Sequence, residues 1–291
     1  MNPYFFKAKS RLGLVNPPYG SKNLNIGVEE APDIILDKTF LSQFKNYSTG
    51  EFTFSKPESV PRRNFFKILA KELKDFSKLI NKKISSKDIQ VVIGGDDSVT
   101  FSSLLAVLER ANHPLELGYI RFDSHADMNL FKSSPTKNFH GMYHRAFFDK
   151  FDKAEINNLV KYKLNPKNVL FIGNLDLDAE EKNFFRSRNF ENINSRQLQN
   201  KPNTVIDKVS RFVKKFKHLH VSFDIDCLDF KDAPATGIPA KGGLPFKSIY
   251  SLLEIIGRHR LTSIDLVEVN PRLSGAKKTV GIAQEVLRVL L

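Results

Sequence analysis

The amino-acid sequence predicts an α/β fold in which a mainly parallel sheet is covered by helices on both of its faces. Two observations support this prediction. Short apolar runs alternate with amphipathic segments of helical spacing from about residue 64 to the C-terminus. Acidic side chains directly follow several of these runs, at the edge of a parallel sheet where ligands bind.

The predicted elements follow one another in a regular order. Residues 11–16 form the first expected strand, and the segment 17–21 is rich in turn formers. A glycine-containing loop then leads into a short helix with Pro32 near its first turn. Residues 64–80 space their apolar side chains as an amphipathic helix does. Beyond them, strands are expected over 89–93, 117–122, 168–172, 218–223 and 262–267, and helices over 98–110, 140–150, 178–186, 205–217, 245–258 and 280–291.

The composition restricts the class of protein. The chain has 291 residues, of which 41% are hydrophobic, and we find no internal repeat, low-complexity segment or linker, so a single domain over residues 1–291 is expected. The single cysteine, Cys227, excludes an internal disulfide framework and fits a reducing compartment. No apolar run approaches the ~20 residues that cross a bilayer, and the N-terminus lacks the apolar core of a signal peptide. We therefore expect a cytoplasmic protein without membrane contact.

The net charge of +13 is spread over most segments of the chain. Local concentrations at residues 82–83, 214–217 and 258–260 fall near predicted helix ends, where cations offset the helix dipole. A nucleic-acid binder would gather such charge on one face with interleaved aromatic residues. A solvated basic surface is the prediction, and a nucleic-acid-associated protein is the alternative.

Residues 123–127, Asp-Ser-His-Ala-Asp, directly follow the strand predicted over 117–122. Their three metal-capable side chains lie at positions i, i+2 and i+4, which share one face of an extended backbone. Two carboxylates and one imidazole that converge in this way are unfavourable unless a cation holds them. For this segment alone, aspartates that cap turns are the alternative.

Three further predicted strands also end in acids, namely Asp97, the pair Asp224 and Asp226, and Glu268. The pair repeats the i, i+2 spacing. So many carboxylates with one histidine suit two divalent ions, and an oxygen-rich site with one imidazole favours Mn²⁺ over Zn²⁺, although Fe²⁺ or Co²⁺ also fits. Paired ions would hold a bridging water as hydroxide at neutral pH.

Two other polar positions near these strand ends invite an interpretation. Asp96, beside paired glycines, is expected to form a turn and to have a structural role. His140 precedes Gly141 after a long loop and could shuttle protons near neutral pH, with a structural histidine as the alternative.

The order and spacing of these motifs resemble the ureohydrolases, the binuclear-manganese family that contains arginase, agmatinase and their relatives. The resemblance runs from about residue 10 to the C-terminus. It implies a three-layer α/β/α fold around a mainly parallel sheet, assembled as trimers or hexamers. The motifs that carry it are Gly-Gly-Asp-Asp-Ser at 94–98, Asp-Ser-His-Ala-Asp at 123–127, Ser-Phe-Asp-Ile-Asp at 222–226 and Glu-Val-Asn-Pro at 268–271.

The resemblance implies two Mn²⁺ ions per chain with a shared set of ligands. Asp123 and Asp224 would bridge both ions. Asp127 would also hydrogen-bond the bridging hydroxide. The remaining ligands would be Asp97 and Asp127 at the first ion and His125 and Asp226 at the second.

The resemblance also implies a reaction. Glu268 would pair with the substrate guanidinium, and His140 would shuttle a proton. Hydroxide attack on the guanidinium carbon would give a tetrahedral intermediate that collapses to urea and an amine. We therefore expect a hydrolase that acts on carbon–nitrogen bonds of linear amidines.

Within the family, the arginases are most similar to this chain. Residues 27–32 resemble their N-terminal signature. L-Arginine is the expected substrate, giving L-ornithine and urea, and agmatine, which lacks the α-carboxylate, or another guanidino compound is the alternative. The matching substrate positions are Asn129 and Thr136 for the α-carboxylate and Asp178 and Glu181 for the α-amino group.

Three departures from the family pattern affect this prediction. Asp97 replaces the histidine of the first metal site, so the first ion would bind weakly or Asp97 would ligate it with altered preference. Ile238 stands where arginases carry a threonine near the substrate, and Ser124 replaces an alanine. A catalytically impaired homologue with one metal or none is therefore a further alternative.

Overall fold

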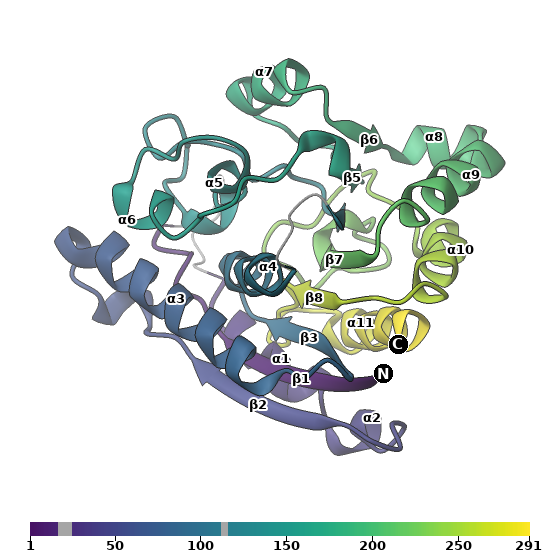
Figure 1. Cartoon of the computed structure of the whole chain (residues 1–291), viewed down its shortest axis with the longest axis horizontal. Coiled ribbons are helices and arrows are strands. Elements are labelled where there is room, and N and C mark those ends of the chain that lie inside the picture. Colours follow the sequence, from purple (N-terminus) through teal and green to yellow (C-terminus); the bar gives the residue numbers. More distant parts are fainter. Residues whose placement is uncertain (17–24, 112–115) are drawn as a thin grey trace.

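The computed structural model describes residues 1–16, 25–111 and 116–291, and its central feature is one parallel sheet of eight strands. The strand order is β2-β1-β3-β8-β7-β4-β5-β6, and every pair is parallel (Figure 1). The predicted α/β class and parallel sheet are confirmed. The strands are β1 (Asn2–Lys9), β2 (Ser48–Thr53), β3 (Asp88–Gly94), β4 (Leu117–Phe122), β5 (Val169–Ile172), β6 (Glu191–Ile193), β7 (His218–Asp224) and β8 (Ser263–Val267).

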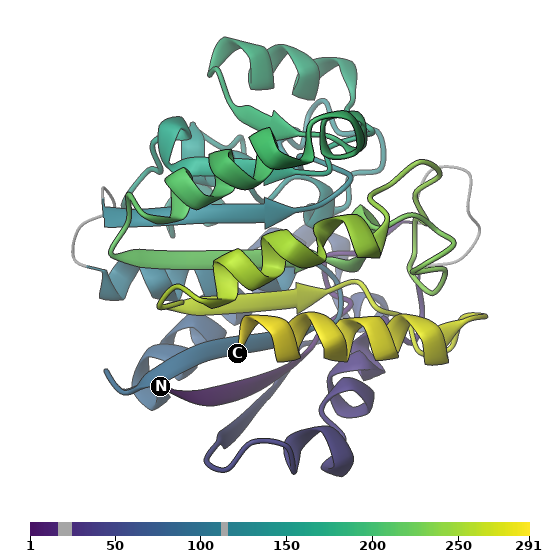
Figure 2. The ribbon, with the colours of Figure 1, turned by 90° about the vertical axis from the view of Figure 1, so that its right-hand side faces the viewer.

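Helices cover both faces of this sheet and give three layers (Figures 1 and 2). One face packs against α1, α2 and α8–α11, and the other packs against α3–α7. The helices are α1 (Ala31–Ile35), α2 (Lys38–Leu41), α3 (Phe65–Lys83), α4 (Ser98–Arg110), α5 (Arg145–Phe148), α6 (Ala154–Asn157), α7 (Ala179–Ser187), α8 (Ser195–Asn200), α9 (Pro202–Val213), α10 (Phe246–Gly257) and α11 (Ala276–Leu290).

Alternation along the strands divides the hydrophobic core into these two layers. Val91 and Ile93 of β3 face one layer, whereas Val92 faces the other. All three side chains are fully buried, because a parallel sheet in the middle of three layers is covered on both faces. This double burial explains why the central strands appear in the sequence as continuous apolar runs.

The structure corrects the expected first strand. Residues 11–16 form a turn in which the amide of Leu14 donates to the carbonyl of Arg11 at 3.1 Å. Their apolar pattern arises because the side chains of Leu12 and Leu14 are buried although they belong to a turn. The first strand is instead β1. Its second residue, Pro3, argues against a strand in the sequence, but a proline near the start of a strand is tolerated because its missing N–H is not needed there. The sequence also did not predict the strands β2 and β6 or the helices α2, α6 and α8.

A second correction concerns the helix expected over 140–150. Residues 139–141 form only a single 3₁₀ turn, and α5 is one short turn further on. Met142 interrupts the helix because its φ of −151° lies far from the helical value near −60°. The other predicted helices and strands are present, with boundaries shifted by a few residues, while the turn predicted over 17–21 lies outside the described residues.

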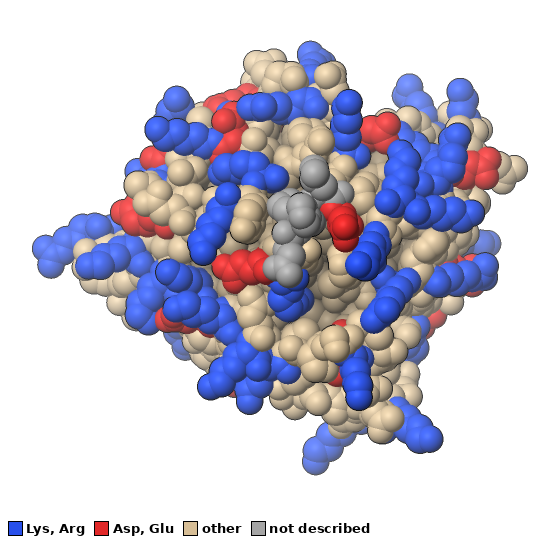
Figure 3. Space-filling model, viewed as in Figure 1, with Lys and Arg blue, Asp and Glu red and all other residues tan. Residues whose placement is uncertain are grey.

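The surface carries the positive charge that the composition predicts. Figure 3 shows Lys and Arg side chains spread around the periphery of one face, with acidic side chains between them. Among the described residues, no helix has the length and apolar character needed to span a membrane.

Candidate functional site

Four neighbouring strands deliver acidic side chains to one edge of the sheet. In the order β3-β8-β7-β4, these strands point the same way, so their carboxyl ends lie together (Figure 2). Asp97 begins α4 just after β3, Asp123 follows β4, Asp224 ends β7 and Glu268 follows β8. The sheet topology therefore brings together acids that are as many as 171 residues apart in the sequence, as Asp97 and Glu268 are.

Close backbone packing fixes the first of these strand ends. A Cβ atom on Gly95 would lie 1.9 Å from the carbonyl oxygen of Ser10, so only glycine fits there. Asp96, next to it, accepts hydrogen bonds from the amides of Gly13 and Ser98, each at 2.9 Å. These contacts agree with the structural role expected for Asp96.

Two site residues have a backbone conformation that is rare for residues other than glycine. The φ angles of Asp127 and Glu268 are +53° and +65°. Such conformations persist where the surrounding structure holds them, and they concentrate at functional sites. Here the amide of Glu268 donates to the carbonyl of Gly95 at 2.8 Å, and the carbonyl of Asp127 accepts from the amide of His144 at 3.1 Å.

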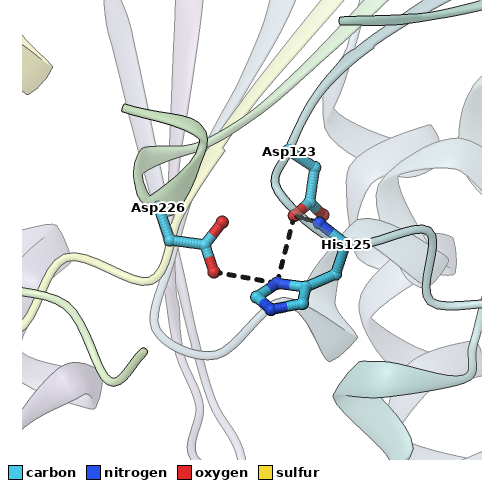
Figure 4. A group of neighbouring side chains, drawn as sticks. All are labelled: Asp123, His125 and Asp226. Carbon is cyan, nitrogen blue, oxygen red and sulfur yellow. Dashed lines mark hydrogen bonds and ion pairs between the residues drawn. The ribbon is translucent and has the colours of Figure 1, made fainter. Parts of the chain in front are cut away.

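Asp123, His125 and Asp226, here called the His125 cluster, place potential ligand atoms within 4.8 Å of one another (Figure 4). The Nδ1 atom of His125 lies 3.1 Å from Oδ2 of Asp226 and 3.5 Å from Oδ1 of Asp123. Burial lowers the pKa of His125, but the carboxylates around it, Asp226 foremost, together outweigh burial and raise the pKa to about 10. Two carboxylates and one imidazole suit a divalent cation, so this cluster fits a metal ion that displaces the proton of His125.

Asp97, Asp123 and Asp127, here called the Asp97 cluster, also place carboxylate oxygens within 4.8 Å of one another. The guanidinium of Arg121 lies among these oxygens. Its Nη2 atom is 2.5 Å from Oδ2 of Asp97 and also contacts Asp123 and Asp127. A metal ion at this position would have to displace that guanidinium, so the Asp97 cluster does not fit a second ion in this arrangement.

Sequence reasoning missed Arg121, although a signal for it exists. Arg121 is the one charged residue in an otherwise apolar strand, and it precedes Asp123 by two positions, so both side chains share a face of β4. An arginine fully buried in a strand requires acidic partners. The unexpected acid at Asp97 is one of them.

Glu268 and His140 contact each other next to Asp97. The Nδ1 atom of His140 is 3.0 Å from Oε1 of Glu268, and the same oxygen accepts from the amide of Asp97 at 2.9 Å. The other carboxylate oxygen accepts from the side-chain amide of Asn25 at 3.1 Å. Asn25 is a further residue that sequence reasoning missed, because it reaches Glu268 only through the fold.

Three of the four residues expected to bind the amino-acid end of a substrate, Asn129, Asp178 and Glu181, lie at the start of α7. Asp178 and Glu181 form the capping box of this helix, which explains their spacing of three residues. The side-chain amide of Asn129 donates to Oδ2 of Asp178 at 2.7 Å, and Oε1 of Glu181 accepts from the amide of Met128 at 2.8 Å. Burial raises the pKa of Glu181.

These groups line one pocket of about 560 Å³. Asp123 does not line it because it is covered by its neighbours and has no exposed surface. Ile238, at the position of the expected threonine, also lines the pocket. The predicted site residues that line it are Asp97, His125, Asp127, Asn129, Thr136, His140, Asp178, Glu181, Asp224, Asp226 and Glu268.

Comparison with known proteins identifies relatives over nearly the whole chain. The model of the Arginase family matches residues 11–291. An arginase of Bacillus subtilis (strain 168) is 32% identical over 216 residues, which are 73% of this chain and 72% of that arginase.

Solved structures match the fold over the same extent. The crystal structure of arginase from Bacillus subtilis is 24% identical with a TM-score of 0.85, covering 100% of this chain and 98% of that one. The structure of Entamoeba histolytica arginase in complex with L-ornithine is 22% identical with a TM-score of 0.84, covering 99% and 97%. These likenesses extend to the whole arrangement of layers and strands.

Proposed function

This chain belongs to the arginase family, and on that premise we propose that it hydrolyses guanidino compounds, with L-arginine as substrate and L-ornithine and urea as products. The observation that carries the proposal is that groups suited to both ends of such a substrate line one pocket. The guanidinium end would face Glu268 and the acids at the strand ends. The amino-acid end would face Asn129 and the capping residues of α7.

The charge and contacts of the pocket support an α-amino acid substrate. Asp178 and Glu181 offer carboxylates to an ammonium group, and the hydrogen-bonding groups of Asn129 and Thr136 can receive a carboxylate. The Oδ1 atom of Asn129 is buried without a hydrogen-bond partner among the described residues, so it can accept from the ammonium group of the substrate, while the carboxylate would accept from Nδ2 of Asn129. L-Ornithine, the ligand of the Entamoeba histolytica neighbour, carries both of these end groups.

The His125 cluster, with Asp224 beside it, would hold the metal ion of the reaction. We propose Mn²⁺, because the donors are carboxylate oxygens with a single imidazole. Bound there, the ion would lower the pKa of a water molecule and supply hydroxide at neutral pH. An ion at the Asp97 cluster takes no part in this reaction, since the guanidinium of Arg121 lies there.

His140 is suited to proton transfer. Burial lowers the pKa of His140, but the hydrogen bond to Glu268 and the charge of that carboxylate raise it to about 9. His140 therefore carries its proton at neutral pH, held between Nδ1 and Glu268. The protonated ring also carries a proton on Nε2, which it can give to the departing amine, while its Nδ1 proton stays in the hydrogen bond to Glu268. Glu268 would face the guanidinium end of the substrate in the same pocket.

Urea release from purified protein tests the proposal. The protein is stripped with EDTA, reloaded with Mn²⁺ and supplied with L-arginine, agmatine, guanidinobutyrate or guanidine. We expect urea from L-arginine, loss of activity in EDTA and recovery with Mn²⁺. If the fully metallated protein releases no urea from any of the four, the proposal is wrong. Faster hydrolysis of agmatine than of L-arginine would select the alternative substrate.

A pair of variants tests the orientation of the substrate. Asn129→Ala should lower kcat/KM for L-arginine about tenfold and leave agmatine unaffected, because agmatine has no carboxylate to lose a hydrogen bond. Asp176→Ala is the matched control, since Asp176 also lines the pocket but has no proposed role. Equal losses with both substrates in Asn129→Ala would contradict this orientation.

We further propose that the chain is a single domain that acts in the cytoplasm as a homo-oligomer, a trimer or hexamer, without nucleic acid as partner. One continuous sheet from β1 to β8 supports the single domain. Light scattering on the eluting protein would measure the oligomeric state, and a monomer would refute the oligomer. Salt-sensitive binding to DNA or RNA would instead favour the basic-protein alternative.

A further inference from the structure

Arg121 extends from β4 into the middle of the acid group that the sheet assembles. The side chain has no exposed surface. Its Nη2 atom contacts three carboxylates from two segments: Asp97 at the start of α4, and Asp123 and Asp127 after β4. Its Nη1 atom donates to Oγ of Ser222 in the neighbouring strand β7 at 3.2 Å. One nitrogen is therefore shared by all three members of the Asp97 cluster.

This arrangement leaves a metal ion no place in the Asp97 cluster. The carboxylate oxygens that would ligate an ion are the ones that accept hydrogen bonds from Nη2 of Arg121. A divalent ion binds carboxylates at about 2.0–2.6 Å, so it would occupy the position of that nitrogen. The two cations exclude each other.

The surroundings of Arg121 also hold the guanidinium in place. The ring centre of Tyr143 lies 5.4 Å from its central carbon, and β4 is fixed between β5 and β7. Rotation away from the cluster would leave a charge buried without its acidic partners, which costs several kcal/mol in proteins. The side chain is thus retained by its partners and by the packing around it.

Asp97 complements this arginine. At this position a neutral histidine would offer the guanidinium no charge, whereas Asp97 supplies a carboxylate and is itself tied to Oγ1 of Thr100 at 2.7 Å. The aspartate at position 97 and the arginine at position 121 therefore complement each other, because they add one negative and one positive charge to the same cluster.

Asp123 connects the guanidinium to the His125 cluster. Its Oδ2 atom faces Arg121, while its Oδ1 atom accepts from the amide of His125 at 2.7 Å and lies toward the imidazole. The carboxylates of the whole group outnumber the one guanidinium, so the His125 cluster still attracts a cation. Asp123 can serve that cation with one oxygen and the arginine with the other.

We infer that Arg121 is a built-in cation that takes the position of the first metal ion, so that each chain binds a single divalent ion, at the His125 cluster. This inference rests on the site of the proposed function, but it concerns the number and position of the ions. The inference can therefore be wrong while the hydrolase activity is confirmed, and it can be right while the hydrolase activity is absent.

Metal content measured on the full-length protein tests this inference. EDTA-stripped protein is titrated with Mn²⁺, and the bound metal per chain is determined by elemental analysis, with an electron paramagnetic resonance spectrum of the loaded sample. We expect one ion per chain and the spectrum of an isolated ion. Two ions per chain, or the spectrum of a spin-coupled pair, would overturn the inference.

Variants locate the ion and test the part played by Arg121. Asp226→Asn should weaken binding of the single ion at least ~10-fold, whereas Asp97→Asn should retain it; the opposite result would overturn the inference. The double variant Arg121→Met/Asp97→His should bind a second ion. Circular dichroism checks its folding, and if it does not fold, the wild-type stoichiometry and the two single variants still decide.

Urea release on the same samples separates the two proposals. One ion with urea release supports both. Two ions with urea release overturn the built-in cation and leave the hydrolase standing. One ion without urea from any guanidino substrate supports the built-in cation and overturns the hydrolase.

Discussion

The stability of Arg121→Met in metal-free protein is the most direct measure of what the buried guanidinium does. Methionine keeps much of the aliphatic stem but removes the charge. In the folded protein, three buried carboxylates would lose the cation that they share. Removal of one partner from a buried ion pair typically costs about 3–5 kcal/mol because the remaining charge is uncompensated. With three carboxylates on one guanidinium, we expect the upper end of that range.

The assay is denaturant unfolding in EDTA, followed by circular dichroism. Arg110→Met is the control, because the Arg110 guanidinium is partly buried and bonds the neutral side chains of Asn81 and Gln90. Its loss should cost only about 2 kcal/mol, since no carboxylate is left unpaired. If Arg121→Met loses no more stability than Arg110→Met, the guanidinium does not neutralise the cluster and the reasoning is refuted.

Added Mn²⁺ provides a second outcome in the same experiment. In Arg121→Met the three carboxylates are released for metal binding, so Mn²⁺ should stabilise this variant more than it stabilises the wild type. A ligand at a hundred times its dissociation constant contributes about 2.7 kcal/mol. An equal gain in both proteins would contradict an opened metal position.

Three more predictions follow from the site. Glu268 raises the folded-state pKa of His140 to about 9, so the protonated ring stabilises the fold fully below the unfolded pKa near 6.5, and this stabilisation is lost as the pH rises through 9. The difference in unfolding free energy between wild type and His140→Asn should be about 3 kcal/mol at most and should vanish over that pH range. Gly95→Ala should destabilise the protein by at least about 2 kcal/mol because its methyl group would overlap the carbonyl of Ser10, and an unchanged melting temperature would show that the backbone can yield. Asp226→Asn should weaken Mn²⁺ binding at least ~10-fold in calorimetry, since it removes a charged ligand of the His125 cluster, and unchanged affinity would exclude that residue as a ligand.

Local patterns determined much of the fold. The central strands are buried on both faces, so each had to be a short apolar run, and β4 and α4 have the bounds that their sequences predict. The elements that the sequence did not predict are those that are not buried on both faces and so do not appear as continuous apolar runs. The strands β2 and β6 have exposed residues. Residues 11–16 resemble a strand in the sequence because Leu12 and Leu14 are buried, although these residues form a turn.

The sequence also determined which residues gather at the site. Strands that run in parallel end at one edge, so acids at their carboxyl ends must meet, and the predicted residues do line one pocket with Asp123 beneath it. Their individual roles remain predictions.

Only the tertiary structure decided what lies between those acids. The sequence shows Arg121 and the unexpected Asp97 as separate features, one in β4 and one at the start of α4. Their contact depends on the strand order, which places the end of β3 within reach of β4 across β8 and β7. A spacing rule relates side chains on one strand, but the meeting of side chains from different strands depends on how the whole chain packs, and it is this meeting that puts a guanidinium where a metal ion was expected.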